Sequence, residues 1–292
     1  MRKMNFIVAA FVVLVIVSLS GCADLKSDLP VTIAPGVSAH QSGWADESSP
    51  DFHGKAIVAA GWDMQSCQTC HGPTYSGGLV NVSCRKCHTG GAGPENCTTC
   101  HGGVNIAPPK DLNGSTSTTS RGVGAHQRHL IGGGASSGYI LACSECHRVP
   151  SAVYVPGHVD TPGPAEVLIS SGLGVTSSNG VSPQPSYDPQ TLSCANTYCH
   201  GNWRVRKSTS PYQLWYSDSV MVGANYTPVW TKGSADAACG ECHGLPPTGH
   251  LPYPLTQCGI CHIGIISGTG TILDKAKHIN GKINVFDTER SY

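Results

Sequence analysis

The sequence has few of the large apolar side chains that fill ordinary protein cores. Its 292 residues include four Phe and four Met, against 36 Gly and 20 Pro. Charged residues make up 12 %, about half of the roughly 25 % usual in globular domains, which argues against a disordered polyelectrolyte. A folded state of this chain therefore needs buried apolar mass that its side chains do not supply.

A net charge of either sign is also missing. Lys and Arg number 18, Asp and Glu also number 18, and the formal net charge is zero. We therefore expect no basic surface that would attract nucleic acid or an anionic membrane surface.

The first residues predict export. Basic residues 2–3 and the apolar run 6–17 have the order of a signal peptide. Residues 19–22, Leu-Ser-Gly-Cys, resemble a bacterial lipobox, in which Cys22 would carry the lipid. A plain transmembrane anchor is the alternative, but the apolar run is shorter than the about 20 residues that a span needs. Ala23 in place of an aspartate favours the outer membrane, by analogy with Gram-negative sorting.

Cysteine, by contrast, is abundant and almost entirely paired. Fourteen of the 15 cysteines form seven pairs, and a histidine directly follows each pair. Six pairs have the spacing C-x-x-C-H: Cys67/Cys70-His71, Cys84/Cys87-His88, Cys97/Cys100-His101, Cys143/Cys146-His147, Cys239/Cys242-His243 and Cys258/Cys261-His262. In the seventh, Cys194/Cys199-His200, four residues separate the cysteines. Only Cys22 lies outside this pattern.

The C-x-x-C-H spacing is typical of covalent haem c attachment. Two thiols form thioethers with the porphyrin vinyl groups, and the adjacent motif histidine binds iron from one face. Zinc sites would not place a histidine after every pair, disulfides leave the histidines unexplained, and thioredoxin-like redox pairs occur singly. For Cys194 and Cys199, a disulfide beside an incidental histidine is the alternative, because the longer segment must bulge. The sequence predicts seven covalently bound haem c groups.

Seven further histidines lie outside these motifs, as many as the predicted haems. They are His40, His53, His126, His129, His158, His250 and His278. Met is a poor iron ligand candidate here, because only Met64 and Met221 follow the predicted signal peptide. We expect bis-histidine ligation of the metal with low, mostly negative potentials, although a surface role is the alternative for each single histidine. His126 and His129, three residues apart, are expected on one helix face, where they would serve two neighbouring haems.

The predicted sites divide the chain into segments. A signal peptide at 1–21 and a tether at 22–39 precede a first haem-binding region with four haems at 40–159, a Gly-, Ser- and Pro-rich linker at 160–190, and a second region with three haems at 191–292. Because Gly and Pro interrupt nearly every longer stretch, we expect mostly coil with short α-helices, few β-strands and the haems forming the core.

Two stretches repeat one order of motifs. Residues 97–158 and 239–278 both read haem motif, Pro-Pro, histidine, haem motif, histidine, which indicates one haem-pair module used twice. A short helix is expected over 124–131, and the aromatic residues of 212–231 favour a short β-hairpin.

The chain resembles a known family around its C-x4-C-H motif. Residues 194–202, Cys-Ala-Asn-Thr-Tyr-Cys-His-Gly-Asn, are followed by Thr-Pro-Val-Trp at 227–230 and Cys-Gly-Glu-Cys-His-Gly-Leu-Pro-Pro at 239–247. This order resembles the Geobacter-type CxxxxCH/CxxCH multihaem cytochrome family, as do residues 51–56, 124–130 and 277–282. The resemblance implies an exported, often lipid-anchored, electron-transfer cytochrome of metal-respiring bacteria.

These features together predict an electron carrier and not an enzyme. Two histidines on each iron leave no open position for a substrate, and the C-x-x-C-K motif of nitrite reductases does not occur in the sequence. We expect the carrier at the outer membrane, on its periplasmic or cell-surface face, with other redox proteins and extracellular acceptors such as ferric iron as partners. The alternatives are a multihaem reductase with one open haem, and a structural subunit of a cytochrome filament or porin–cytochrome conduit.

The motif count predicts the haem stoichiometry. All fourteen paired cysteines should be consumed in thioethers, so the intact mass of the mature protein should exceed that of the polypeptide by seven haems. A gain of six haems, with Cys194 and Cys199 in a disulfide, would contradict haem attachment at the C-x4-C-H motif.

The lipobox predicts the fate of the variant Cys22→Ala. Without the thiol that accepts the lipid, the precursor should stay uncleaved, or the protein should lose its membrane anchor. Mass analysis of the N-terminal peptide and immunoblots of membrane fractions measure both. If the variant is processed and anchored like the wild type, the lipoprotein interpretation is wrong.

Overall fold

The structure, a computed structural model, describes residues 39–103, 105–131, 139–160 and 163–291. The predicted signal peptide, the predicted lipidation site Cys22 and almost all of the predicted tether lie outside these residues. The chain divides between Ala59 and Ala60 into two units, called here the first and the second unit. Within the described ranges, no helix is both long enough and apolar enough to cross a bilayer.

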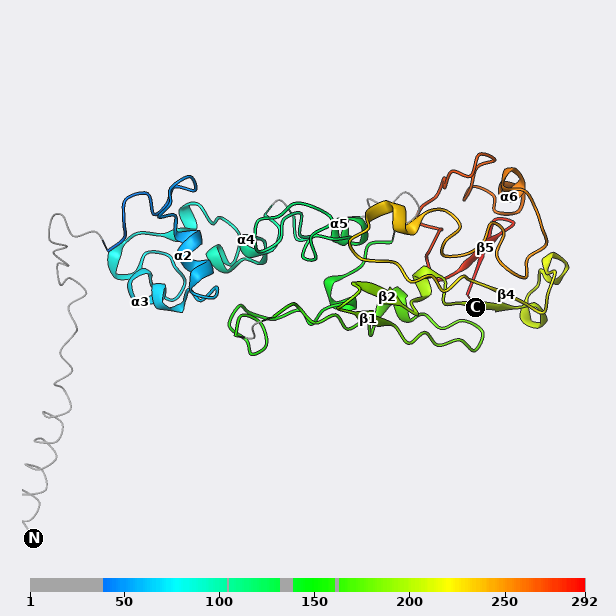
Figure 1. Ribbon diagram of the computed structural model, residues 1–292, viewed down its shortest axis with the longest axis horizontal. Helices are drawn as coiled ribbons and strands as arrows, with labels where there is room; N and C mark the ends of the chain where they lie inside the picture. Colours follow the sequence, from blue (N-terminus) through cyan, green and yellow to red (C-terminus); the bar gives the residue numbers. More distant parts are fainter. Residues whose placement is uncertain (1–38, 104, 132–138, 161–162, 292) are drawn as a thin grey trace, which may run out of the picture. The chain divides into compact units, whose positions relative to one another are not determined.

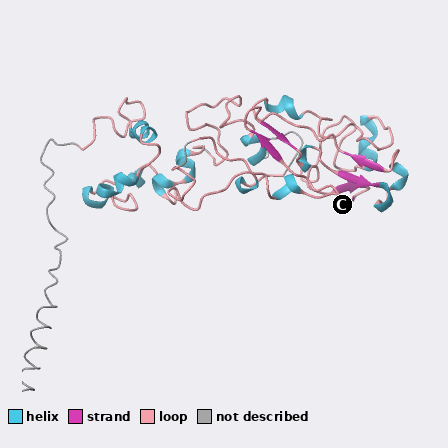
Figure 2. Ribbon diagram, turned by 60° about the horizontal axis from the view of Figure 1, so that its bottom comes forward, coloured by secondary structure: helices cyan, strands magenta, loops and turns pink. Residues whose placement is uncertain are grey.

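Loops make up most of the described chain, as Figure 2 shows. The α-helices (Figure 1) are α2 His53–Ala59, α3 Gln68–His71, α4 Cys97–Cys100, α5 His126–Leu130 and α6 Cys258–Cys261. The 3-10 helices are η1 Gln65–Cys67, η2 Gly78–Val80, η3 Cys84–Lys86, η4 Gly93–Glu95, η5 Cys143–Glu145, η6 Gly172–Val175, η7 Tyr198–His200, η8 Lys207–Thr209, η9 Gln213–Trp215, η10 Gly233–Ala237 and η11 Leu255–Gln257. The predicted irregular fold with short helices and few strands is confirmed, and α5 falls within the helix expected over 124–131.

Three small antiparallel strand pairs lie in the second unit. They are β1 Ser186–Asp188 with β2 Ser193–Ala195, β3 Arg204–Arg206 with β4 Val220–Val222, and β5 Ile283–Val285 with β6 Thr288–Arg290. The expected β-hairpin over 212–231 is wrong. Instead, the β4 residue Val222 pairs with Arg204 on one side, and its amide donates to the carbonyl of Thr248 on the other, at 3.0 Å. The aromatic stretch therefore finds its partners in distant segments.

Side chains alone leave much of the second unit's interior unfilled. Among the described residues, the buried apolar side chains are Met64, Tyr75, Ala107, Val123, Leu173, Tyr198, Tyr216 and Ile265. The second unit contains a cavity of about 2290 Å³, more than twice the upper end of about 1,000 Å³ for ordinary ligand pockets. The scarcity of apolar residues in the composition thus appears in the fold as a large apolar-lined space.

Candidate haem sites

The short motifs present their chemistry on one side of a helical turn. In four of them the amide of the motif histidine donates to the carbonyl of the first cysteine: His88 to Cys84 at 3.0 Å, His101 to Cys97 at 2.8 Å, His147 to Cys143 at 2.8 Å and His262 to Cys258 at 2.9 Å. Residues three and four apart share a face of such a turn. Both thiols and the imidazole of a C-x-x-C-H motif therefore lie on the same face, as a single bound porphyrin requires.

The backbone of the C-x4-C-H motif differs from that of the C-x-x-C-H motifs. Cys194 lies in β2, whereas Cys199 and His200 lie in η7. The chain bulges between them at Asn196, whose φ of 58° is in the left-handed region that asparagine adopts more readily than most residues. Both cysteines are unpaired thiols, like every cysteine that the structure describes. The residues of this motif are therefore compatible with two thioether bonds.

Four motif histidines each face one of the further histidines. The ring centres lie 6.1 Å apart in His101–His158 and in His126–His147, 6.3 Å apart in His129–His200 and 6.4 Å apart in His243–His278. An imidazole–metal bond is about 2 Å long, so two such bonds and the depth of the two rings place the ring centres about 6 Å apart. Each pair has the spacing for one iron between its rings.

Side chains of five motifs line the cavity of the second unit. Its lining includes both thiols of each of these motifs, the motif histidines His101, His147, His200, His243 and His262, and the further histidines His126, His129, His158, His250 and His278. Eight of these ten histidines form the four ring pairs, and the other two are His262 and His250. Burial is the main cause that lowers the pKa of His262, and the nearby charge of His250 adds to it. A fifth pairing of these two histidines is therefore consistent with their placement.

Backbone carbonyls orient most of these imidazoles. The Nδ1 atoms of nine histidines lie 2.6–3.1 Å from a carbonyl oxygen: His53, His71, His126, His129, His147, His158, His243, His250 and His262. A carbonyl only accepts, so Nδ1 must carry the proton and Nε2 keeps its lone pair. This arrangement is usual for metal-binding histidines, whose outer nitrogen donates to a fixed acceptor.

Burial favours the neutral form of several imidazoles and thiols in these sites. It is the main cause that lowers the pKa of His126 and of His200 to about 4, so neither imidazole is protonated near neutral pH. Burial also raises the pKa of the Cys146, Cys194 and Cys242 thiols to about 11. The neutral imidazole is the form that binds iron, and the residues present fit a covalently bound haem with two histidine ligands.

The ring pairs follow the internal repeat. In each repeated stretch the outer two histidines face each other: His101–His158 in the first and His243–His278 in the second. The inner histidines of the first stretch, His126 and His147, also face each other, and those of the second stretch are His250 and His262. His129 has no counterpart in the second stretch and faces His200 of the C-x4-C-H motif instead. Helix α5 therefore carries one histidine toward each of two different motifs, as expected for His126 and His129.

The first two motifs lie outside the cavity. The motifs at 67–71 and 84–88 belong to the second unit but do not line its cavity. Cys70 and Cys87 are exposed, as are Cys97 and Cys239 at the cavity. Haem attachment at the first two motifs stays a prediction.

The first two motifs pack close to each other. Burial, followed by the nearby thiol of Cys67, raises the pKa of the Cys84 thiol, so the first cysteines of the two motifs lie near each other. Tyr75 is 3 % exposed, and its carbonyl accepts a hydrogen bond from the Cys84 amide at 3.0 Å. A haem bound at either of these motifs would therefore lie outside the cavity of the second unit.

The two remaining histidines belong to the first unit. There the Trp44 ring stacks on His40 at 4.4 Å, and the Trp44 carbonyl accepts a hydrogen bond from Nδ1 of His53 at 2.7 Å. One tryptophan therefore holds both of these predicted iron ligands.

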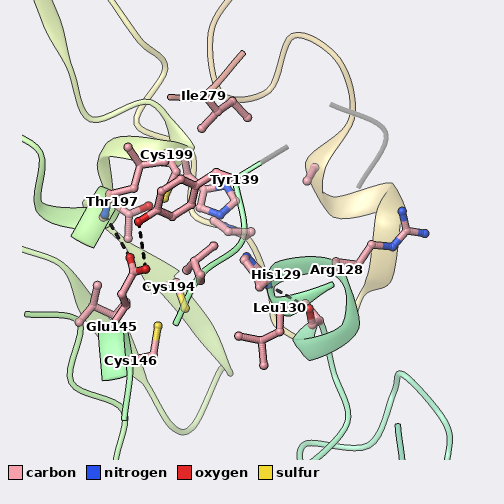
Figure 3. A pocket seen from close by; sticks show the side chains of 18 of the residues that line it. Arg128, His129, Leu130, Tyr139, Glu145, Cys146, Cys194, Thr197, Cys199 and Ile279 are labelled. Atoms are coloured by element: carbon pink, nitrogen blue, oxygen red, sulfur yellow. Dashed lines mark hydrogen bonds between the residues drawn. The ribbon is translucent and has the colours of Figure 1, made fainter. Parts of the chain in front are cut away.

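Sequence reasoning missed a buried carboxylate between the cysteines of the fourth motif. The side chain of Glu145 is 7 % exposed and accepts hydrogen bonds from the Tyr139 hydroxyl and the Ala142 amide at 3.0 Å and from the Leu173 amide at 3.1 Å. Figure 3 shows this carboxylate beside Cys146 and Cys194. It fixes the η5 turn against η6, and an acidic residue between two cysteines of a charge-poor chain was the only available sign of it.

The motifs and the paired imidazoles define the class as a c-type cytochrome with several haems. Residues 193–243, which contain the motifs at Cys194–His200 and Cys239–His243, match the family model described as the Geobacter CxxxxCH...CXXCH motif. Over these residues, the match confirms the resemblance predicted from the sequence. No curated protein and no solved structure matches the chain significantly.

Replacing His278 tests one of the ring pairs. In His278→Ala, the iron bound by His243 would lose its second ligand, so one haem per chain should become high-spin. Titration of the reduced protein with carbon monoxide should then show one added binding equivalent per chain.

Lys277→Ala is the matched control. Lys277 precedes His278 in the chain, and its ammonium lies 3.9 Å from the carboxylate of Asp274, so this variant should bind no more carbon monoxide than the wild type. A fully low-spin His278→Ala variant would remove His278 from the set of iron ligands.

Proposed function

We propose that the protein is a heptahaem electron-transfer relay, anchored at the outer membrane through Cys22 and active in extracellular metal respiration. The observation that carries this proposal is that four motif histidines each face a further histidine, with 6.1–6.4 Å between the ring centres. When bound, haem c supplies one-electron redox chemistry at potentials set by its ligands and surroundings.

Histidine pairing favours a carrier over a reductase. The second imidazole opposite four of the motif histidines occupies the position where a substrate would have to bind. The Nδ1 hydrogen bonds to backbone carbonyls hold these imidazoles in place and make them stronger ligands. His40 and His53 complete a set of seven further histidines for seven motifs, which supports the proposed stoichiometry.

Neighbouring sites in the second unit lie close to one another in the order of the sequence. Burial, followed by the charges of His158 and His147, lowers the pKa of His101, so the third and fourth motifs are close. Burial, followed by the thiol of Cys194, raises the pKa of Cys146 to about 11. The fourth motif therefore adjoins the C-x4-C-H motif (Figure 3).

The same contiguity continues toward the C-terminus. The thiol of Cys242 lies 3.8 Å from Nδ1 of His200, so the C-x4-C-H motif touches the sixth motif. His243 of the sixth motif contributes, after burial and His250, to the lowered pKa of His262 in the seventh. Because electron-transfer rates fall steeply with distance, five consecutive sites close to one another support a relay through the second unit.

The proposed partners follow from the sequence. The lipobox at Cys22 and the residue after it favour the outer membrane, and the family resemblance implies metal-respiring bacteria. Other cytochromes would then deliver electrons, and an extracellular acceptor such as ferric iron would take them. The zero net charge favours no acceptor by electrostatic attraction.

Two experiments test the relay. The reduced purified protein should be reoxidised rapidly by soluble ferric chelates in a stopped-flow measurement. A deletion strain should reduce ferric oxide more slowly than its parent while growing normally on a soluble intracellular acceptor, and the wild-type gene should restore the rate. Normal ferric oxide reduction in a deletion strain without redundant paralogues would contradict the respiratory role.

A further inference from the structure

The indole of Trp230 contacts both histidines of α5. Its ring centre lies 5.6 Å from that of His129 with the rings nearly parallel at 17°, and 4.7 Å from that of His126 with the rings at 87°. One face of the indole therefore packs along His129 while His126 meets it edge to face. Both are favourable aromatic geometries, and α5 is only five residues long, so these contacts fix its two rings from outside the helix.

The indole itself is held at several points. Its Nε1 donates a hydrogen bond to the carbonyl of Arg121 at 2.9 Å. The Trp230 amide donates to the carbonyl of Leu192 at 2.7 Å, and the Cys194 amide donates to the carbonyl of Pro228 at 3.0 Å. The segment that carries Trp230 is therefore hydrogen-bonded alongside the strand of the C-x4-C-H motif.

Gly124 makes room for this contact. It is buried, has a φ of 42° and lies two residues before His126, and a Cβ atom at this position would overlap the Trp230 indole. Any other residue would both strain the left-handed backbone and push the indole away from the helix. The close approach of Trp230 to the start of α5 thus depends on this glycine.

The four ring pairs fall into two classes by the angle between their planes. The angles are 29° in His101–His158, 33° in His126–His147, 66° in His129–His200 and 74° in His243–His278. In a low-spin ferric haem, this angle sets the splitting of the iron d orbitals, and near-perpendicular rings give the larger maximum g value. Through His126 and His129, α5 serves one pair of each class.

We propose that Trp230 is a positioning residue that fixes the ring planes of His126 and His129 and thereby sets the ligand geometry of two neighbouring haems together. The inference rests on the proposed bis-histidine ligation. A single side chain whose face meets one imidazole and whose edge meets another constrains both ring rotations, which the Nδ1 hydrogen bonds alone leave less restricted.

A similar arrangement occurs in the first unit. There the Trp44 ring stacks on His40 at 9°, and lies 6.3 Å from His53 with the rings at 43°. A tryptophan thus contacts two further histidines at two separate places in the chain, which supports a positioning role over incidental packing.

Electron paramagnetic resonance of the ferric protein tests the role of Trp230. The wild type should give low-spin signals of both classes. In Trp230→Leu, with unchanged haem content, one signal of each class should shift its maximum g value while the others stay in place. Trp230→Phe keeps an aromatic face but loses the Nε1 donor, so the same two signals should shift less.

Trp215→Leu is the matched control, because Trp215 is also half-buried but its ring packs against Tyr253 and Phe286. It should leave both signals of the α5 pairs unmoved. Unchanged signals in Trp230→Leu, or equal shifts in Trp230→Leu and Trp215→Leu, would overturn the positioning role while leaving the proposed function intact. A wild type without low-spin bis-imidazole signals would overturn the proposed function and this inference with it.

Discussion

The gap between paired imidazoles is the constraint on which the rest of the structure depends. Two rings must stand about 6 Å apart, with their unprotonated nitrogens facing, if a metal is to bond to both. Long helices would be the usual way to hold such rings, but the described helices have at most seven residues. The chain instead fixes each ring locally, through a carbonyl on Nδ1 and through aromatic contacts such as those of Trp230.

The composition of the chain and the cavity of its second unit are related. A chain with four Phe and four Met cannot fill the interior of its second unit, and a space of about 2290 Å³ remains among the described residues. Porphyrins bound to the five motifs that line this space would supply the missing apolar surface, as we propose. Glycine is abundant for a related reason, since the chain must turn sharply around flat groups, as it does beside the indole at Gly124.

The sequence was a good guide to chemistry and a poor one to long-range contacts. The motifs, the irregular fold and the short helix at α5 could be read from local spacing, because thioether attachment and helical turns are local. The pairing of His129 with His200 could not, because it joins segments far apart in the chain. The β4 strand was missed for the same reason, since its partners lie outside the aromatic stretch.

Which motifs line the cavity was equally beyond local spacing. The motifs at 67–71 and 84–88 have the same spacing as motifs that line the cavity, yet they lie outside it. The contacts of Glu145 and Trp230 also arise only from folding.

Anomalous X-ray scattering at the iron edge, measured on crystals of the haem-loaded protein, tests the histidine pairing most directly. Five iron peaks should lie in the cavity of the second unit, each midway between two imidazoles: His101 and His158, His126 and His147, His129 and His200, His243 and His278, and His250 and His262. Iron atoms bound to the motif histidines but facing a solvent molecule, or a different second histidine, would contradict the pairing and with it the relay that it supports.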